Sequence, residues 1–297
     1  MTHVLRLVAD ELSQPVAPAV ADMAEAVTKQ HAGSLGVLFY GSCLRETRLD
    51  GLMLDFYLIV EDYRTAFGKR WQAVANRLLP PNVFPFAHAG LVAKYAVLSL
   101  ADLQRETGPG ARDASTFARF AQPARLVWSR DEAARNTIAH AVAQAAPTLA
   151  ERTLPLVADR DDPLALWREA FVRTYRAELR AERGTRPGSI VDADPERYAA
   201  LTRALRHDQP WLFDAPDAHR RDLAEREWGR ISRHGKRRQV AKLAKGSLTF
   251  AGGIDYLAWK INRHAGTALA ITPWQRRHPL LAAVTLLPRL LRQGAVR

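Results

Sequence analysis

Short apolar runs alternate with amphipathic segments along this chain. Residues 37–40, 52–60 and 90–99 are runs of strand length, and a further apolar run ends at Trp128. Pro80 and Pro81 close the segment before the third run, and residues 84–86 are predicted to form a loop. Apolar residues recur at helical spacing in segments 16–30, 63–79, 129–157, 164–183, 198–211 and 219–236. The pattern predicts an α+β fold.

The helical segments also predict which side chains reach the core. In segment 63–79 the apolar residues Phe67, Trp71, Val74 and Leu78 share one helix face, and a core position is the expectation for that face. The same argument predicts core positions for Leu166, Phe171, Tyr175, Leu179, Trp211 and Trp228.

The polar stretch 159–163, which ends in Pro163, is the best boundary signal in the chain. We therefore expect a first domain over 1–158, a helical domain over 159–240 and a basic C-terminal segment over 241–297. A length of 297 residues with 47% apolar content is sufficient for cores in two modest domains.

Positive charge is concentrated at the C-terminus. The net charge is +12, and residues 231–297 carry thirteen Lys and Arg against one acid, Asp255. A nucleic-acid enzyme more often spreads positive charge along its cleft, whereas a basic tail suits an anionic surface. The basic run 234–238 lacks the interleaved aromatic residues of single-strand binders, so no nucleic-acid partner is expected.

An apolar run near the end of the chain is too short to cross a bilayer. The residues between Pro279 and Pro288 would span only ~15 Å as a helix, about half of the hydrocarbon core. Arginines at 276, 277, 289 and 292 flank the run. An interfacial helix is the favoured interpretation, and packing against the protein body is the alternative.

The single cysteine, Cys43, excludes an intramolecular disulfide and fits a reducing compartment. No Cys-His arrangement accompanies it, so a packed side chain is expected. The first residues resemble neither a signal peptide nor a mitochondrial presequence, which favours a bacterial cytoplasmic location.

Candidate chemistry lies between the first two apolar runs. Gly41 allows close backbone approach to a triphosphate, and Ser42 offers a hydroxyl at the start of a short helix. Asp55, within an apolar strand, is expensive to bury unless something binds it, and it could hold Mg²⁺. This is the sequence shape of a nucleotidyltransferase core, although a structural acid after a common turn is the alternative.

The predicted metal site has one acid on its strand. Tyr57 stands where related folds often carry a second carboxylate, and Glu61 is too far along the strand to share an ion. Asp50 and Asp62, in the flanking loops, are the other possible ligands. In the third apolar run, Lys94 either extends from a sheet edge into solvent or meets phosphate oxygens in a cleft.

The order of several short motifs makes a family resemblance specific. Tyr40-Gly41-Ser42 is followed by Leu54-Asp55-Phe56, by Lys94-Tyr95 with a later Ser99, and by Arg119 with Gln122-Pro123. This order, with further elements at 174–180 and 242–256, resembles the translocator assembly and maintenance family. Members of that family are phosphatidate cytidylyltransferases of mitochondria with bacterial relatives. Ala118 departs from the glycine expected at that position.

The resemblance implies a nucleotidyltransferase domain, a winged-helix-like helical domain and a cleft between them. The implied reaction converts CTP and phosphatidate to CDP-diacylglycerol and pyrophosphate with Mg²⁺, at an anionic membrane surface to which the C-terminus attaches peripherally. This attachment would be to the cytoplasmic face of the inner membrane. Members of the family also tend to carry a single acid at this position of the metal site. A nucleotidyltransferase for RNA or a soluble acceptor, and a non-catalytic membrane-associated protein of the same fold, are the alternatives.

The resemblance also assigns roles to particular residues. It implies catalytic roles for Asp55, Lys94 and Arg119, with Asp55 as the metal ligand. Nucleotide-binding positions are Tyr40, Gly41, Ser42, Lys94 and Tyr95, and substrate or support positions are Tyr175, Glu178, Arg180, Lys242 and Lys245.

Overall fold

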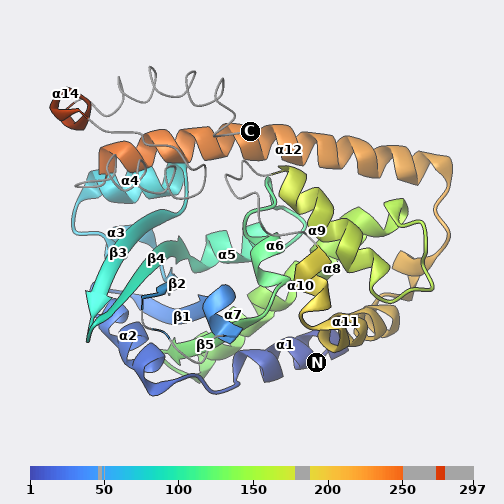
Figure 1. Cartoon of the computed structure of the whole chain (residues 1–297), viewed down its shortest axis with the longest axis horizontal. Coiled ribbons are helices and arrows are strands. Elements are labelled where there is room, and N and C mark those ends of the chain that lie inside the picture. The colour runs from blue at the N-terminus through green and yellow to red at the C-terminus, as the bar shows by residue number, and fades with distance from the viewer. Residues whose placement is uncertain (46–48, 50, 178–187, 250–271, 278–297) are drawn as a thin grey trace.

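Five strands form one mixed sheet in the order β3-β4-β2-β1-β5 (Figure 1). The structure is a computed structural model of the chain and describes residues 1–45, 49, 51–177, 188–249 and 272–277. β2 and β4 are parallel, and the other neighbouring strands are antiparallel. The strands are β1 Ser34–Tyr40, β2 Met53–Val60, β3 Asn82–His88, β4 Leu91–Ser99 and β5 Ala124–Ser129. The four predicted apolar strands are therefore confirmed.

The fifth strand, β3, occupies the stretch that was predicted to be a loop. Pro85 lies within it and pairs with Lys94 of β4. β3 is at the edge of the sheet, where a residue without a backbone N–H is tolerated because one side of the strand has no neighbour to accept from it. Proline therefore misled the prediction at an edge position.

Helices surround the sheet and continue beyond it (Figure 1). Polar side chains start several of them: the Thr2 hydroxyl accepts from Leu5 N, and Asp62 and Asp131 cap α3 and α7 in the same way. The α-helices before residue 160 are α1 His3–Leu12, α2 Pro18–Thr28, α3 Tyr63–Ala66, α4 Arg70–Leu78, α5 Leu100–Thr107, α6 Phe117–Phe120, α7 Glu132–Ala143 and α8 Ala145–Thr153. Those after it are α9 Ala165–Ala177, α10 Gly188–Asp192, α11 Pro195–Asp208, α12 Ala218–Thr249 and α14 Pro273–Arg277.

Two hydrophobic clusters lie on the two faces of the sheet. One contains Phe39, Phe56 and Tyr95 with α2 and α3, and the buried Cys43 belongs to it as expected. The other contains Leu38 and Tyr57 and extends through α1 and α5–α9 to α11 and α12. Alternate residues of β1, β2 and β4 reach opposite clusters, as the pleat requires.

The helices after Pro163 share the larger of these clusters with the sheet. Trp167 is fully buried on α9, and its Nε1 donates to Tyr198 O and to Thr202 Oγ1, both at 2.9 Å. Trp228 is also buried, and its Nε1 donates to Arg152 O at 2.9 Å. All regular secondary structure in the described part of 159–240 is helical, and the winged-helix-like arrangement stays a prediction.

Several predicted boundaries differ from the observed ones. The segment 129–157 contains α7, α8 and the short 3₁₀ turn Leu154–Leu156 rather than one helix. α12 continues through residue 240, so the predicted limit of the helical domain lies inside a helix. Trp211, which was expected in the core, is 57% exposed, because it lies on a short 3₁₀ turn at the surface.

The outward face of α4 is the largest departure from the sequence prediction. Phe67 precedes the helix and is buried as expected, but Trp71, Val74 and Leu78 are exposed. The helix instead turns Ala73 and Asn76 inward, and Asn76 Nδ2 donates to Val97 O of β4 at 3.0 Å.

No helix in the described part of the chain is both long and apolar enough to cross a membrane.

Candidate functional site

Asp55 and Lys94 form the centre of the candidate site. They are directly paired positions on the parallel strands β2 and β4, so their side chains leave the same face of the sheet. Lys94 Nζ lies 3.0 Å from Asp55 Oδ1, and the two side chains are 33% and 22% exposed. The structure thus joins the predicted acid to the predicted cation in a partly open position.

Gly41 brings the backbone close to the same carboxylate. It follows Tyr40, the last residue of β1, which pairs with Asp55 across the strands. The φ of Gly41 is +96°, and a Cβ at this position would lie 3.2 Å from Asp55 Oδ2. A side chain here would be strained and would crowd the carboxylate. Ser42 then begins the short 3₁₀ helix Ser42–Arg45 and is exposed.

Aromatic rings and an arginine surround the buried side of the site. Arg119 of α6 places its guanidinium 4.8 Å from the centre of the Tyr40 ring, and Tyr57 lies 5.2 Å from the same ring. Burial raises the pKa of Tyr40 well above its usual value, and the neighbouring Tyr57 and Asp55 raise it further. Tyr40 therefore stays protonated and can take part only as a neutral phenol.

Tyr57 entered the sequence analysis only as the position of a missing acid. The structure shows that it shares a sheet face with Asp55 and packs on Tyr40. The period-two alternation of the strand was the signal that would have identified it, because residues 55 and 57 must point the same way.

Tyr95 is not brought to the Asp55 group. It follows Lys94 on β4 and so points to the opposite face, into the cluster that contains Phe84 and Phe56. His31 Nε2 lies 3.1 Å from Tyr95 Oη, and burial raises the pKa of Tyr95 to about 12. A nucleotide cannot contact Lys94 and Tyr95 from one side of the sheet.

The carboxylate of Asp55 is compatible with a bound cation. Its Oδ1 is shielded from solvent and forms an ion pair with Lys94. This oxygen accepts no hydrogen bond of ordinary geometry within the described structure. Its Oδ2 faces the space that a side chain at Gly41 would fill. Mg²⁺ commonly takes one or two carboxylates and completes its shell with water and substrate phosphates, so one acid is sufficient for such a site.

Asp62, one of the two candidate second ligands, does not join Asp55. Asp62 follows the far end of β2, where Oδ1 accepts from Arg64 N and Thr65 N as the cap of α3. Asp50 lies outside the described residues. The described part of the chain contains one group of three potential metal ligands, His3, His207 and Asp208, and Asp55 is not a member.

The predicted substrate or support lysines lie on α12. Lys245 Nζ donates to Leu79 O and, at 3.3 Å, to Pro81 O, where α4 leads into β3. Burial, with the nearby charges of Lys242 and Arg238, lowers the pKa of Lys245 to about 8. These contacts attach the C-terminal half of α12 to the sheet domain beside α4, as Figure 1 shows.

Arg238 supports this attachment and was not identified from the sequence. Its guanidinium lies 3.2 Å from Asp113 Oδ2 and 3.4 Å from Glu106 Oε1, and both acids are buried. Burial alone would raise the pKa of Asp113, but the charges of Lys242 and Arg238 outweigh it and lower that pKa. The three basic residues therefore face the protein rather than an open site. Their helical spacing was the available signal.

The remaining predicted support residues lie on and after α9. Tyr175 is half-buried on α9. Glu178 and Arg180 lie outside the described residues.

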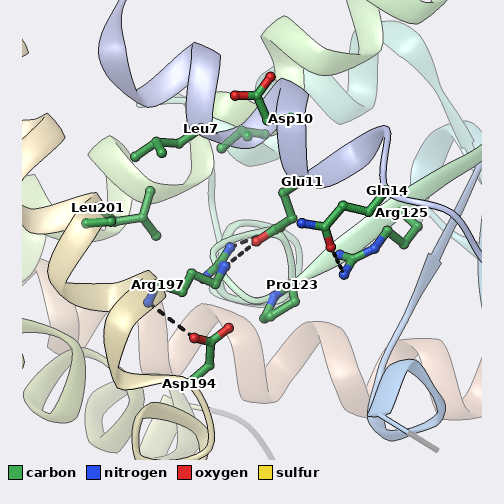
Figure 2. A pocket seen from close by; sticks show the side chains of 11 residues that line it. Leu7, Asp10, Glu11, Gln14, Pro123, Arg125, Asp194, Arg197 and Leu201 are labelled. Atoms are coloured by element: carbon green, nitrogen blue, oxygen red, sulfur yellow. Dashed lines mark hydrogen bonds and ion pairs between the residues drawn. The ribbon is translucent and has the colours of Figure 1, made fainter. Parts of the chain in front are cut away.

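A separate pocket of about 260 Å³ lies between α1, the start of β5 and α11 (Figure 2). Both of its arginines already bind other side chains of the lining. Arg197 binds the Glu11 carboxylate, with Arg197 Nη2 at 3.2 Å from Glu11 Oε1, and Arg125 donates to Gln14. Figure 2 shows these side chains pointing toward each other across the pocket rather than outward. The polar side chains of this pocket therefore join α1, β5 and α11 to one another. Neither Asp55 nor Lys94 lines it.

Comparison with known proteins adds little beyond this geometry. No protein-family model matches the chain, and no curated protein matches it either. Among solved structures it is similar to a nucleotidyltransferase-like protein from Exiguobacterium sibiricum 255-15, with 12% identity and a TM-score of 0.29. That similarity covers 93% of this chain and 92% of the other. At this identity and TM-score the similarity carries no argument about activity, so the functional conclusion depends on the site.

Proposed function

We propose that this chain is a nucleotidyltransferase, and more specifically a phosphatidate cytidylyltransferase. The observation that carries the proposal is the partly open Asp55–Lys94 pair, with Oδ1 and Nζ 3.0 Å apart, beside the positive-φ Gly41. A metal-binding carboxylate, a phosphate-binding cation and a glycine turn are the groups that a nucleoside triphosphate needs.

Asp55 would hold Mg²⁺, which when bound neutralises charge on the triphosphate and on the departing pyrophosphate. The fit rests on Oδ1, which accepts no hydrogen bond of ordinary geometry in the described structure, and on Oδ2, which faces the space beside Gly41. Lys94 supplies a positive charge on the same sheet face. It is partly exposed and can move from Asp55 toward a phosphate oxygen when the nucleotide arrives.

The proposed acceptor makes one acid sufficient. A phosphate monoester has a second pKa near ~6, so phosphatidate is already an anionic nucleophile at neutral pH and needs no general base. Its oxygen forms a bond to the α-phosphorus of CTP as the bond from that phosphorus to the bridging oxygen breaks. Pyrophosphate leaves with the electron pair. The site must therefore align two anions and offset their repulsion.

Arg119 and Tyr40 would shape the inner wall of the site. The guanidinium lies over the Tyr40 ring at 4.8 Å, which restricts its orientation. The charges of Arg119 and Asp55 both act on the pKa of Tyr40, so both are close to that ring. The hydroxyl of Tyr40 stays neutral because burial raises its pKa. We assign Arg119 to charge neutralisation and Tyr40 to its positioning.

The proposed substrate requires contact with a membrane. We place the protein at the cytoplasmic face of the inner membrane as a peripheral protein, and the sequence support is the basic segment 231–297 with its short apolar run. That apolar run, residues 279–288, lies outside the described residues.

Acceptor selectivity tests the proposal. Full-length protein is incubated with Mg²⁺ and CTP labelled on the α-phosphate, together with phosphatidate, with RNA, or with no acceptor. Label in CDP-diacylglycerol alone supports the proposal. Label in RNA supports the first alternative, and CTP binding without transfer to either acceptor supports a non-catalytic protein.

A further inference from the structure

Helix α4 turns its apolar face to solvent. Trp71, Val74 and Leu78 are 50%, 57% and 78% exposed, whereas the buried residues of the helix are Ala73 and Asn76. Positions 71, 74 and 78 follow one another at helical spacing and so form one continuous stripe. Three large apolar side chains on one exposed stripe are unusual for a helix that serves only to pack on its own protein.

The orientation of α4 is fixed by its inner side. Asn76 is completely buried and donates from Nδ2 to Val97 O of β4 at 3.0 Å, while Ala73 packs in the cluster beneath. Rotating the helix about its axis to bury Trp71 would break this hydrogen bond and leave Val97 O without the Asn76 donor. The outward stripe is therefore a stable feature of the fold.

Positive charge borders the apolar stripe. Lys69, Arg70 and Arg77 are exposed, and the helix sequence RWQAVANRL contains no acid. Apolar residues that include a tryptophan, edged by Lys and Arg, are the composition of a helix that lies in a membrane interface. The nine residues extend only ~14 Å, which suits a helix lying flat on a bilayer.

We propose that α4 docks on an anionic lipid bilayer. Trp71, Val74 and Leu78 enter the boundary between headgroups and acyl chains, and Lys69, Arg70 and Arg77 contact lipid phosphates. The positive charges beside the apolar stripe favour an anionic bilayer as the partner of this surface. A stable protein interface involves roughly 20–30 residues a side, far more than the three apolar residues of this short helix.

This inference deepens the membrane part of the proposed function and rests on it for its biological meaning. It assigns the contact to a described helix of the sheet domain, in addition to the C-terminal segment. Lys245 of α12 bonds to Leu79 O and Pro81 O directly after α4, so the docking helix is connected to the rest of the protein at both its inner face and its end.

The test measures co-sedimentation of the full chain with vesicles. The vesicles contain phosphatidylcholine either alone or with phosphatidylglycerol, at low and high salt. We expect the variant W71S/V74S/L78S to bind the anionic vesicles at least about tenfold more weakly, because it loses most of the apolar contact. The matched control W211S/L223S removes two similarly exposed apolar residues elsewhere and should bind like the natural chain.

A second pair of variants tests the charges. R70E/R77E should bind anionic vesicles at least about tenfold more weakly, with a weaker salt dependence and unchanged binding to neutral vesicles. R203E/R221E, which changes exposed arginines of α11 and α12, is its control. Equal vesicle binding by W71S/V74S/L78S and its control would overturn the inference. A dimer that the triple substitution dissociates, or binding of RNA that it abolishes, would also overturn it in favour of another occupant.

Catalysis is scored separately so that the two ideas can fail independently. With a short-chain, water-soluble phosphatidate, W71S/V74S/L78S should turn over CTP like the natural chain, because Asp55 and Lys94 are unchanged. Vesicle binding through α4 without any CMP transfer would refute the proposed function and leave the docking inference standing. CMP transfer to phosphatidate, together with vesicle binding that the α4 substitutions do not change, would support the proposed function and refute the docking inference.

Discussion

Lys94 Nζ and Asp55 Oδ1 lie 3.0 Å apart because the two residues occupy paired positions on neighbouring parallel strands. Both side chains are partly exposed, and an ion pair in such a position typically adds only ~0–1 kcal/mol to stability. The pair therefore contributes little to holding the sheet together. Its place beside Gly41, where Asp55 Oδ2 faces an unfilled side-chain position, is what a phosphate-binding site requires.

Replacing Lys94 by alanine should weaken CTP binding and leave the fold intact. The variant loses one positive charge beside the triphosphate, so we expect the Kd for CTP to rise about tenfold or more. Isothermal titration calorimetry with CTP and Mg²⁺ provides the measurement. Lys69→Ala, which removes an exposed lysine of α4's flank, is the control. Unchanged CTP affinity in the Lys94 variant would make that lysine structural.

Gly41→Ala should lower stability and disturb the site together. The positive φ and the 3.2 Å approach to Asp55 Oδ2 should cost about 1–3 kcal/mol of unfolding free energy. Gly51→Ala is a matched control, because Gly51 has a φ of +72° but no atom within 4 Å of the added Cβ. Urea unfolding and CTP titration of both variants test this. Equal CTP affinity in the two would show that the region around Gly41 is not a nucleotide site.

Asp208 gives a pH-dependent prediction. Burial alone would raise its pKa, but hydrogen bonds from Val4 N and His3 N lower it from 3.8 to about 2. A carboxyl whose pKa falls on folding stabilises the protein above its unfolded pKa and loses that effect as the pH falls through the folded value. Asp208→Asn should therefore be less stable at pH 7, and the difference should shrink between pH 4 and pH 2.

Denaturant unfolding of the natural chain and of Asp208→Asn across this pH range measures the effect. Asp161→Asn, an exposed acid elsewhere, should show little difference at any pH. A stability difference for Asp208→Asn that stays constant down to pH 2 would contradict the role assigned to the hydrogen bonds from His3 N and Val4 N to Asp208.

Deleting residues 273–297 should leave CTP binding intact and reduce turnover of phosphatidate in bilayers. The segment carries five of the chain's arginines and its short apolar run, and each basic residue near an anionic surface adds roughly 1 kcal/mol of attraction. Vesicle co-sedimentation of the full and shortened chains at low and high salt is the measurement. Identical partitioning would show that this segment does not contribute to membrane attachment.

The sequence predicted where strands and helices lie better than it predicted which face of a helix is buried. Apolar runs located β1, β2, β4 and β5, and the turn at Gly41 before the short 3₁₀ helix was also foreseen. Periodicity correctly grouped Trp71, Val74 and Leu78 on one face of α4, but it cannot tell whether a face points to the core or to solvent. That choice was made by Asn76, which bonds to β4.

The site could be predicted in part for the same reason. Asp55 and Lys94 stood out as charges within apolar strands, but their pairing depends on the parallel register of β2 and β4, which local sequence does not encode. Tyr95 was assigned to the nucleotide although strand alternation places it opposite Lys94. Arg238 was missed because its partners Glu106 and Asp113 are distant in sequence.

Transfer of CMP to phosphatidate by the natural chain and by Asp55→Asn tests the central claim most directly. The amide keeps the shape of the carboxylate and loses its charge, so the variant should fold normally, which thermal unfolding verifies, and lose about a hundredfold or more of turnover. The assay follows labelled CDP-diacylglycerol formed from α-labelled CTP with Mg²⁺. We predict product with the natural chain and almost none with the variant. Equal product from a well-folded Asp55→Asn protein would contradict the account.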